Sequence, residues 1–226
     1  MKSRCGIEIE FTTEGDPVTD IIENLTENGI EVRHESYNHE TRSWWKMTTD
    51  SSCGMELVSP ILSERTYRST RAAMSSIVNG GGSVNRNCGF HVHIEPQTRI
   101  SYEDALQVVE LYNEAFDDIL RPMLAASRLD NRFCRRWDTC DYEDTDDPDA
   151  RYVAVNLMSL SRYGTIEFRQ HQGTLNSTKA LTWMQMMDTL TSVALGGGTV
   201  SNYITALRAS LPSQNFSYAI NRGVNL

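Results

Sequence analysis

The sequence predicts an α+β fold in which helices cover one face of a sheet and charged side chains occupy the other. Three observations predict it. Strand patterns that alternate apolar and charged residues recur far apart in the chain, four or five helical patterns are mixed among them, and no repeat or clear linker divides the 226 residues. We therefore expect one domain over residues 1–226, with six to eight strands.

Three of the predicted strands each carry two polar groups on one face, because side chains alternate between the two faces of a strand. Apolar residues such as Ile7, Phe90 and Ile166 would face the core. The other face would present Glu8 and Glu10 from residues 5–11, His91 and His93 from residues 87–94, and Glu167 and Arg169 from residues 164–169. One such strand could simply face water. Three together favour a functional site.

The first half of the chain predicts two helices and a hairpin around these strands. Asp16-Pro17 is expected to open a helix, Gly29 to end it, and residues 30–35 to form a strand. Residues 43–60 predict a hairpin with its turn at residues 50–54, and residues 63–78 predict a second helix. Glu56 in the hairpin could join the carboxylate face, although a single glutamate in a strand is more often exposed.

The second half predicts further helices and one more strand. Ser101 would begin a long helix that Pro122 interrupts, and the apolar run 152–160, which contains Asn156, predicts a strand. Residues 176–195 predict a helix rich in methionine, and residues 203–211 predict the last helix.

Residues from about 128 to 151 have no usable period and form an acidic loop. Its acidic residues include Asp138, Asp141, Glu143, Asp144, Asp146, Asp147 and Asp149. The segment lacks the ligand ladder and central glycine of a calcium loop. A solvated loop is the simplest interpretation. The functional alternative is a substrate lid or docking loop that favours a cationic amine, free or on a basic peptide.

Composition indicates a soluble globular protein. The net charge of −9 argues against nucleic acid and anionic membrane as partners. No apolar run approaches the ~20 residues that a membrane span needs, and residues 1–4 do not resemble a signal peptide. The five cysteines contain no CxxC pair, so we expect reduced thiols and a cytoplasmic location. The oligomeric state stays open.

The chemistry of the polar face points to divalent cations. Carboxylates that face each other in a partly buried site must be protonated or bridged by cations. Four glutamates with His91 suit Mg²⁺ or Mn²⁺, which prefer oxygen ligands, and Arg169 beside them would suit a phosphoryl group. The chain has no P-loop, no GxGxxG after a strand, no GxSxG elbow and no HExxH helix. These observations suggest metals and nucleotide phosphate.

Four motifs then resemble, in order and spacing, those of the amidoligase family. They are residues 6–11 (GIEIEF), Asp50-Ser51-Ser52 followed by residues 54–60 (GMELVSP), residues 88–93 (CGFHVH) and residues 164–169 (GTIEFR). The family belongs to the carboxylate-amine ligases, which include glutamine synthetase and γ-glutamylcysteine synthetase. The resemblance covers the chain from about residue 5 to about residue 195.

The resemblance implies a twisted, mainly antiparallel sheet like the catalytic domain of glutamine synthetase, with ATP and Mg²⁺ (or Mn²⁺) on its concave face. A carboxylate, on a small molecule or a peptide, would become an acyl phosphate, and an amine would displace phosphate to leave an amide. The implied metal ligands are Glu8, Glu10, Glu56, His91 and Glu167. His91, Arg169, Asn87 and Asn156 would serve the nucleotide, and Arg169, His93 and Glu167 the catalysis. Asp50 has an uncertain supporting role.

Alternatives remain open at this point. A metal-dependent hydrolase or cupin-like enzyme could use His91 and His93 for Zn²⁺ or Fe²⁺, although no third histidine stands where such a site would want one. An inactive binding module on the same fold is a second alternative, and amide hydrolysis, the reverse reaction, is a third. The sequence does not say which carboxylate and which amine are joined.

Overall fold

The described part of the chain folds around one eight-stranded sheet with helices, as the sequence predicts. The computed structural model describes residues 3–15, 18–63, 67–138, 141 and 149–226. The strands follow the order β2-β3-β4-β1-β6-β8-β7, and β5 pairs with the end of β1. Their bounds are β1 (Cys5–Thr13), β2 (Val32–His34), β3 (Trp45–Asp50), β4 (Gly54–Val58), β5 (Gly82–Ser83), β6 (Phe90–Ile94), β7 (Val155–Asn156) and β8 (Ile166–Phe168).

Pairing in this sheet is antiparallel except between β2 and β3, which run parallel. The prediction of a mainly antiparallel sheet is therefore confirmed. The central strand β1 pairs with β4 on one side and with β6 on the other. Three strands that carry charged residues thus lie next to one another.

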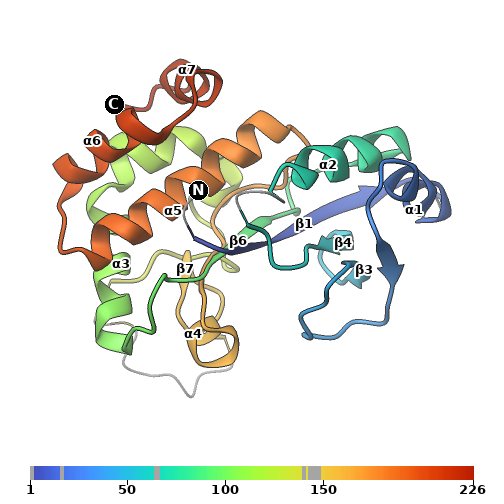
Figure 1. Cartoon of the computed structure of the whole chain (residues 1–226), viewed down its shortest axis with the longest axis horizontal. Helices are drawn as coiled ribbons and strands as arrows, with labels where there is room; N and C mark the ends of the chain where they lie inside the picture. Colours follow the sequence, from blue (N-terminus) through green and yellow to red (C-terminus); the bar gives the residue numbers. More distant parts are fainter. Residues whose placement is uncertain (1–2, 16–17, 64–66, 139–140, 142–148) are drawn as a thin grey trace.

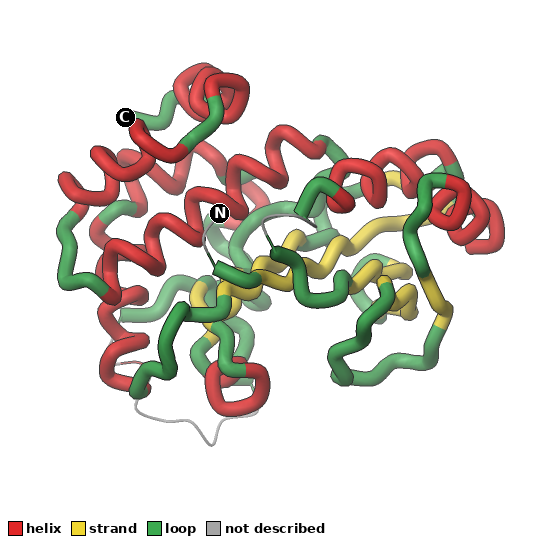
Figure 2. The backbone as a smooth tube through the Cα atoms, viewed as in Figure 1, coloured by secondary structure: helices red, strands yellow, loops and turns green. Residues whose placement is uncertain are grey.

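The longer helices lie along one side of the sheet, where α2 and α5 run past β1 and β6, and the short α4 lies on the other side (Figure 1). Figure 2 shows the same separation by secondary structure. The helices are α1 (Val18–Glu27), α2 (Ser69–Asn79), α3 (Tyr102–Glu114), α4 (Met158–Tyr163), α5 (Ser177–Leu195), α6 (Val200–Ser210) and α7 (Ser213–Asn221). A π-helical turn (Phe116–Leu120) and two 3₁₀ segments (Arg121–Met123 and Ala126–Arg128) follow α3. None of the described helices is long and apolar enough to cross a membrane.

The core lies between the sheet and these helices, and alternate strand residues fill it. Ile7, Ile9, Phe90, Val92 and Phe168 are at most 1% exposed. Helix α5 is buried along most of its length, and Trp183, Met184, Met186 and Met187 are fully buried, as the sequence predicts for core residues. With one face of each strand committed to this core, the charged residues of β1, β6 and β8 must point to the other face.

Predicted helix ends agree with the structure where capping chemistry is specific. Ser101 and Asp104 form a capping box at the start of α3, and Asn176 accepts a hydrogen bond from the Lys179 backbone N–H at the start of α5. The hairpin β3-β4 turns at residues 50–54, where Gly54 has a φ of 110°. The expected helix opening at residues 16–17 lies outside the described residues, and so do residues 139–140 and 142–148 of the acidic loop.

Three predictions about elements were wrong. The run 152–160 forms a strand only at Val155–Asn156, because the Asn156 side chain accepts the Met158 backbone N–H at 2.9 Å and the chain turns into α4. Helix α2 starts at Ser69 rather than at residue 63, and residues 203–211 are not the last helix, since α7 follows. Gly164, with a φ of 69°, ends α4 and leads into β8.

His171, whose role the sequence leaves open, is a fully buried core residue that predicts a pH effect on stability. Its Nδ1 is 2.7 Å from the Gln172 carbonyl oxygen, and its ring lies 5.1 Å from the Trp183 ring. Burial, and next the charge of Lys179, hold the pKa of His171 well below its usual value of 6.5. Below about pH 6.5 the unfolded chain therefore binds a proton that the folded chain excludes, and folding loses up to about 1.4 kcal/mol per pH unit.

Urea unfolding between about pH 8 and pH 5 checks this expectation. His171→Asn keeps a donor near the Nδ1 position and cannot titrate, so its stability should fall less steeply with acid than that of the wild type. His34→Asn, at an exposed position, is the matched control and should keep the wild-type slope. Equal slopes for all three proteins would show that His171 does not carry the effect.

Candidate active site

The strand register places the candidate residues opposite one another on one sheet face. Cross-strand partners share a face, and the partners are Glu8 with His91, Glu10 with Glu56, His93 with Glu167 and Glu167 with Asn156. Their side chains, with those of Asn87 and Arg169, line one cavity of about 760 Å³. The structure therefore brings together every residue that the sequence selects for the site.

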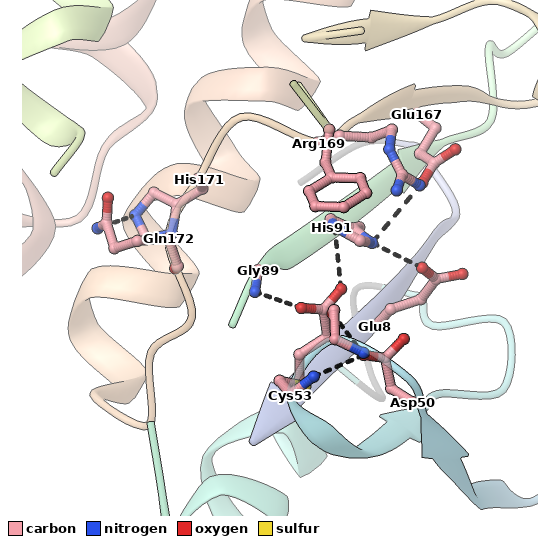
Figure 3. A network of polar contacts seen from close by, with 12 residues as sticks. Glu8, Asp50, Cys53, Gly89, His91, Glu167, Arg169, His171 and Gln172 are labelled. Atoms are coloured by element: carbon pink, nitrogen blue, oxygen red, sulfur yellow. Dashed lines mark hydrogen bonds and ion pairs between the residues drawn. The ribbon is translucent and has the colours of Figure 1, made fainter. Parts of the chain in front are cut away.

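His91 lies at the centre of this cluster, between two carboxylates of β1 (Figure 3). Its Nδ1 is 2.8 Å from Glu8 Oε2 and 3.8 Å from Glu167 Oε1, and its Nε2 is 3.4 Å from Glu10 Oε1. Glu10 is held in turn by the Gly89 backbone N–H, which donates to Glu10 Oε2 at 2.5 Å. One imidazole thus contacts carboxylates on both of its nitrogens.

His93 lies two residues further along β6 and is close to two of these carboxylates, Glu8 and Glu167. Its Nε2 is 3.4 Å from Glu8 Oε1 and 3.8 Å from Glu167 Oε1. Its Nδ1 is 3.0 Å from the hydroxyl of Thr165, and its cross-strand neighbour on β1 is Gly6. His93 is more exposed than His91, with 13% of its side chain accessible against 5%. It therefore lies closer to the open part of the cavity.

Glu167 and Arg169 form an ion pair at the edge of the cluster, where Asn156 also contributes. Arg169 Nη1 donates to Glu167 Oε1 at 2.5 Å, and Asn156 Nδ2 donates to Glu167 Oε2 at 2.6 Å. The Nε of Arg169 is buried and has no hydrogen-bond partner among the described residues, and its guanidinium lies 5.9 Å from the Tyr152 ring. A buried donor without a partner is costly, so this group is suited to receive an anion.

Glu56, Asp50 and Asn87 occupy the side of the cavity nearest β4. Glu56 is 9% exposed, and oxygens of Glu56 and Glu10 lie within 4.8 Å of each other and of His91. Asp50 Oδ1 accepts hydrogen bonds from Ser52 and Cys53, so it stabilises the β3-β4 turn. Asn87 is exposed at the cavity wall. Asp50 therefore has a structural partner in the protein, whereas Glu56 has none among the described residues.

Charges in the cluster shift the carboxyl groups in opposite directions. Burial, together with the charges of Glu8 and Glu10, raises the pKa of Glu56 well above 4.5. Burial alone would also raise the pKa of Glu8, but hydrogen bonds from His91 and His93 hold it well below 4.5. Burial opposes the charges of Arg169 and His93 at Glu167, and the charges prevail, so the pKa of Glu167 is lowered. Positive charge within the cluster therefore stabilises the ionised forms of Glu8 and Glu167 but not that of Glu56.

The donor set fits hard divalent cations. Ligand atoms of Glu8, His91 and Glu167 lie within 4.8 Å of one another, and so do those of Glu10, Glu56 and His91. A third group among the described residues combines Glu10 and Asp50 with Cys53. Each group holds at most one histidine, and the two central groups are rich in oxygen, as Mg²⁺ and Mn²⁺ prefer. This composition does not match the histidine-rich set of the cupin-like alternative.

A family model described as "Putative amidoligase enzyme" matches residues 1–148 and 139–191. The chain belongs to the amidoligase family. No curated protein matches the sequence significantly. Among solved structures, the complex between the prokaryotic ubiquitin-like protein Pup and its ligase PafA is similar at 8% identity and a TM-score of 0.40. That match covers 99% of this chain and 51% of the other, so the chain spans about half of its length.

Sequence reasoning missed several residues of this amidoligase site. Arg128, Tyr152 and Thr165 line the same cavity. Arg128 lies at the start of the stretch without a period, and Tyr152 begins the apolar run that follows it, so neither residue stands in the alternating pattern that marks the site. Thr165 is visible in the sequence beside Glu167, but only the pairing of β6 with β8 brings its hydroxyl to His93.

A substitution at Gly89 provides a steric test of the candidate site. A Cβ at this position would lie 2.7 Å from His91 Nε2 and 3.3 Å from Glu10 Oε1. Gly89→Ala should therefore displace His91, destabilise the fold by about 1 to 3 kcal/mol and weaken Mg²⁺ binding. Gly6→Ala is the control, since its Cβ would make an ordinary 3.6 Å contact with His93 Cβ. Calorimetric Mg²⁺ titrations of both variants compare the sites, and equal Mg²⁺ affinity in Gly89→Ala and the wild type would contradict the proposed position of the ion.

Proposed function

We propose that this amidoligase is an ATP- and Mg²⁺-dependent carboxylate-amine ligase. In the proposed reaction, a substrate carboxylate takes the γ-phosphoryl group of ATP and releases ADP, and an amine then attacks the acyl carbon and releases phosphate. The product is an amide. The observation that carries the proposal is the convergence of four glutamates, two histidines and Arg169 on one sheet face.

Two overlapping groups of side chains would hold the cations. Glu8, His91 and Glu167 would form one site, and Glu10 and Glu56 with His91 the other, because their ligand atoms already lie within 4.8 Å. Bound Mg²⁺ would neutralise the phosphate charges and orient the nucleotide. We propose that the sheet that carries these residues has the fold of the glutamine synthetase catalytic domain.

Arg169 would stabilise the phosphoryl group as it transfers. Its Nη1 is held by Glu167, and its Nε, which has no hydrogen-bond partner in the described part of the chain, is available to a ligand oxygen. Asn156 fixes the other oxygen of Glu167, so the ion pair is held from both sides. No side-chain nucleophile is required, since positioning and charge stabilisation account for phosphoryl transfer.

His93 would serve the substrates from the more open wall of the cavity, and Asn87, which lines the same cavity, would serve the nucleotide. Burial tends to lower the pKa of His93, but the charge of Glu167 and the hydrogen bond to Glu8 outweigh it and raise this pKa. A positively charged His93 beside the reacting carboxylate would orient it. We propose small-molecule or peptide carboxylates and amines as substrates.

We also propose a cytoplasmic location. Cys5, Cys53, Cys88 and Cys134 are free and buried, which agrees with a reducing compartment.

Trapping of the acyl phosphate tests the proposed function. The protein is incubated with Mg²⁺, ATP, hydroxylamine and a panel of amino-acid and peptide carboxylates, and hydroxamate and ADP are measured. We expect hydroxamate and ADP in equal amounts with the correct carboxylate, and neither product from Glu167→Gln. Hydroxamate that forms without ATP would instead indicate the chemistry of an amidase.

A further inference from the structure

A second arginine, Arg128, is buried and reaches the candidate site from another part of the chain. It ends the 3₁₀ segment Ala126–Arg128, is 3% exposed and lines the same cavity as Glu10 and His91. Its Nη2 donates to the Arg169 carbonyl oxygen at 2.8 Å, and its Nε donates to the Gln170 carbonyl oxygen at 3.3 Å. These two bonds fix the guanidinium beside the end of β8.

The charge of Arg128 lacks a counter-ion within the described residues, where none of the ion pairs includes it. A guanidinium has five N–H donors and keeps its proton in proteins, and a buried charge without a partner is costly. Lys46 provides a contrast, because it is 4% exposed and its ammonium donates to three oxygens, from the Asn38 carbonyl, the Asn38 side chain and the Glu40 carbonyl. The Lys46 ammonium thus has an oxygen acceptor for each of its three donors. The guanidinium of Arg128 has five donors and hydrogen bonds to only two backbone carbonyls among the described residues.

The space in front of Arg128 is kept free by Gly89. A Cβ on Gly89 would lie 3.3 Å from Arg128 Nη2, 3.3 Å from Glu10 Oε1 and 2.7 Å from His91 Nε2. Polar groups from β1, from β6 and from the segment after α3 therefore surround one point that no side chain occupies. A glycine at such a point lets a ligand approach the backbone closely.

We propose that Arg128 is a second phosphate-binding arginine, which contacts the nucleotide from the Glu10 side while Arg169 contacts it from the Glu167 side. This inference rests on the proposed function and specifies its ligand. A chain of phosphates offers enough negative oxygens for two guanidinium groups, so the site would select nucleoside diphosphates and triphosphates over monophosphates.

Nucleotide affinities of matched variants test this proposal. Calorimetric titration in Mg²⁺ gives the Kd of ATP and of AMP for the wild type, Arg128→Gln, Arg128→Lys and the control Arg132→Gln. Arg132 is exposed in the same segment, and its guanidinium lies over the Phe133 ring. We expect Arg128→Gln to weaken ATP binding by about ten- to a hundredfold, Arg128→Lys to recover part of it, and AMP binding to be unchanged.

The outcomes separate this inference from the proposed function. A wild type that does not bind Mg²⁺-ATP overturns both. Wild-type binding with an unchanged ATP Kd in Arg128→Gln overturns only the role of Arg128, and equal losses for ATP and AMP assign Arg128 a purely structural role. If the variants do not fold, ¹⁵N NMR of the wild-type Arg128 Nε–H replaces them. This signal should shift with Mg²⁺-ATP and not with AMP, and an unchanged signal with ATP would contradict the proposal.

Discussion

Replacing Arg169 with glutamine is expected to lower the rate of ATP-dependent amide formation by about 10³- to 10⁵-fold, the range found for arginines that stabilise phosphoryl transfer. The physical reason is the position of its guanidinium, which lies half-buried beside Glu167 and has a buried Nε without a hydrogen-bond partner among the described residues. Glutamine cannot supply the charge. The measurement is the initial rate of ADP release with the carboxylate identified by hydroxylamine trapping.

Two further variants make the Arg169 result specific. Arg169→Lys keeps the charge but loses the planar fork, so it should recover only part of the rate. Arg135→Gln removes an exposed arginine outside the cavity and should keep the wild-type rate. Thermal unfolding of each variant establishes that it is folded. A folded Arg169→Gln protein with a wild-type rate would remove Arg169 from the chemistry.

Replacing Glu56 with glutamine is expected to stabilise the metal-free protein while it weakens the response to Mg²⁺. Glu56 is 9% exposed, and burial together with Glu8 and Glu10 raises its pKa well above 4.5. Ionising this group in the folded protein therefore costs free energy that the unfolded chain does not pay. As the pH rises above about 4.5, the wild type should lose stability relative to Glu56→Gln, by up to about 1.4 kcal/mol per pH unit, until the pH reaches the folded pKa.

Urea unfolding in EDTA between about pH 5 and pH 8, then in excess Mg²⁺, checks both parts of the Glu56 prediction. Mg²⁺ should stabilise the wild type more than Glu56→Gln, since an amide replaces a ligand carboxylate in one of the two proposed groups. Glu14→Gln, at an exposed position, is the matched control and should behave as the wild type in both buffers. A Glu56→Gln protein that is less stable than the wild type in EDTA and gains as much stability from Mg²⁺ would refute the proposed ligand role.

The site could be predicted from sequence to the extent that strand alternation defines it. Glu8, His91 and Glu167 stand between buried apolar residues, so the face that each occupies follows from a period of two. The register that pairs Glu10 with Glu56 and His93 with Glu167 is a property of the folded sheet, and no local pattern encodes it. The register was not predicted, and the family resemblance supplied only the expectation that Glu56 and His93 belong to the site.

The wrong predictions about elements, and the failure to predict Arg128, also have physical causes. The apolar run around Asn156 suggests a strand, but the Asn156 side chain accepts the Met158 N–H, and Ser159 donates to the Asn156 and Thr165 carbonyls, which folds the run into α4. Helix α7 has only nine residues, and Pro212 at its N-cap makes no side-chain hydrogen bond, so no capping signal marks its start. Arg128 lies outside any periodic pattern, and only tertiary contacts bring it to Gly89.

The central claim is that the carboxylate and histidine face binds Mg²⁺-ATP. Thermal unfolding of the wild type and of Glu10→Gln, each alone, with Mg²⁺-ATP and separately with Zn²⁺, tests it most directly. A ligand at about 100 times its Kd adds about 2.7 kcal/mol, a shift of several degrees. We expect Mg²⁺-ATP to raise the Tm of the wild type and not that of Glu10→Gln. Stabilisation by Zn²⁺ alone, or by neither ligand, would contradict the account.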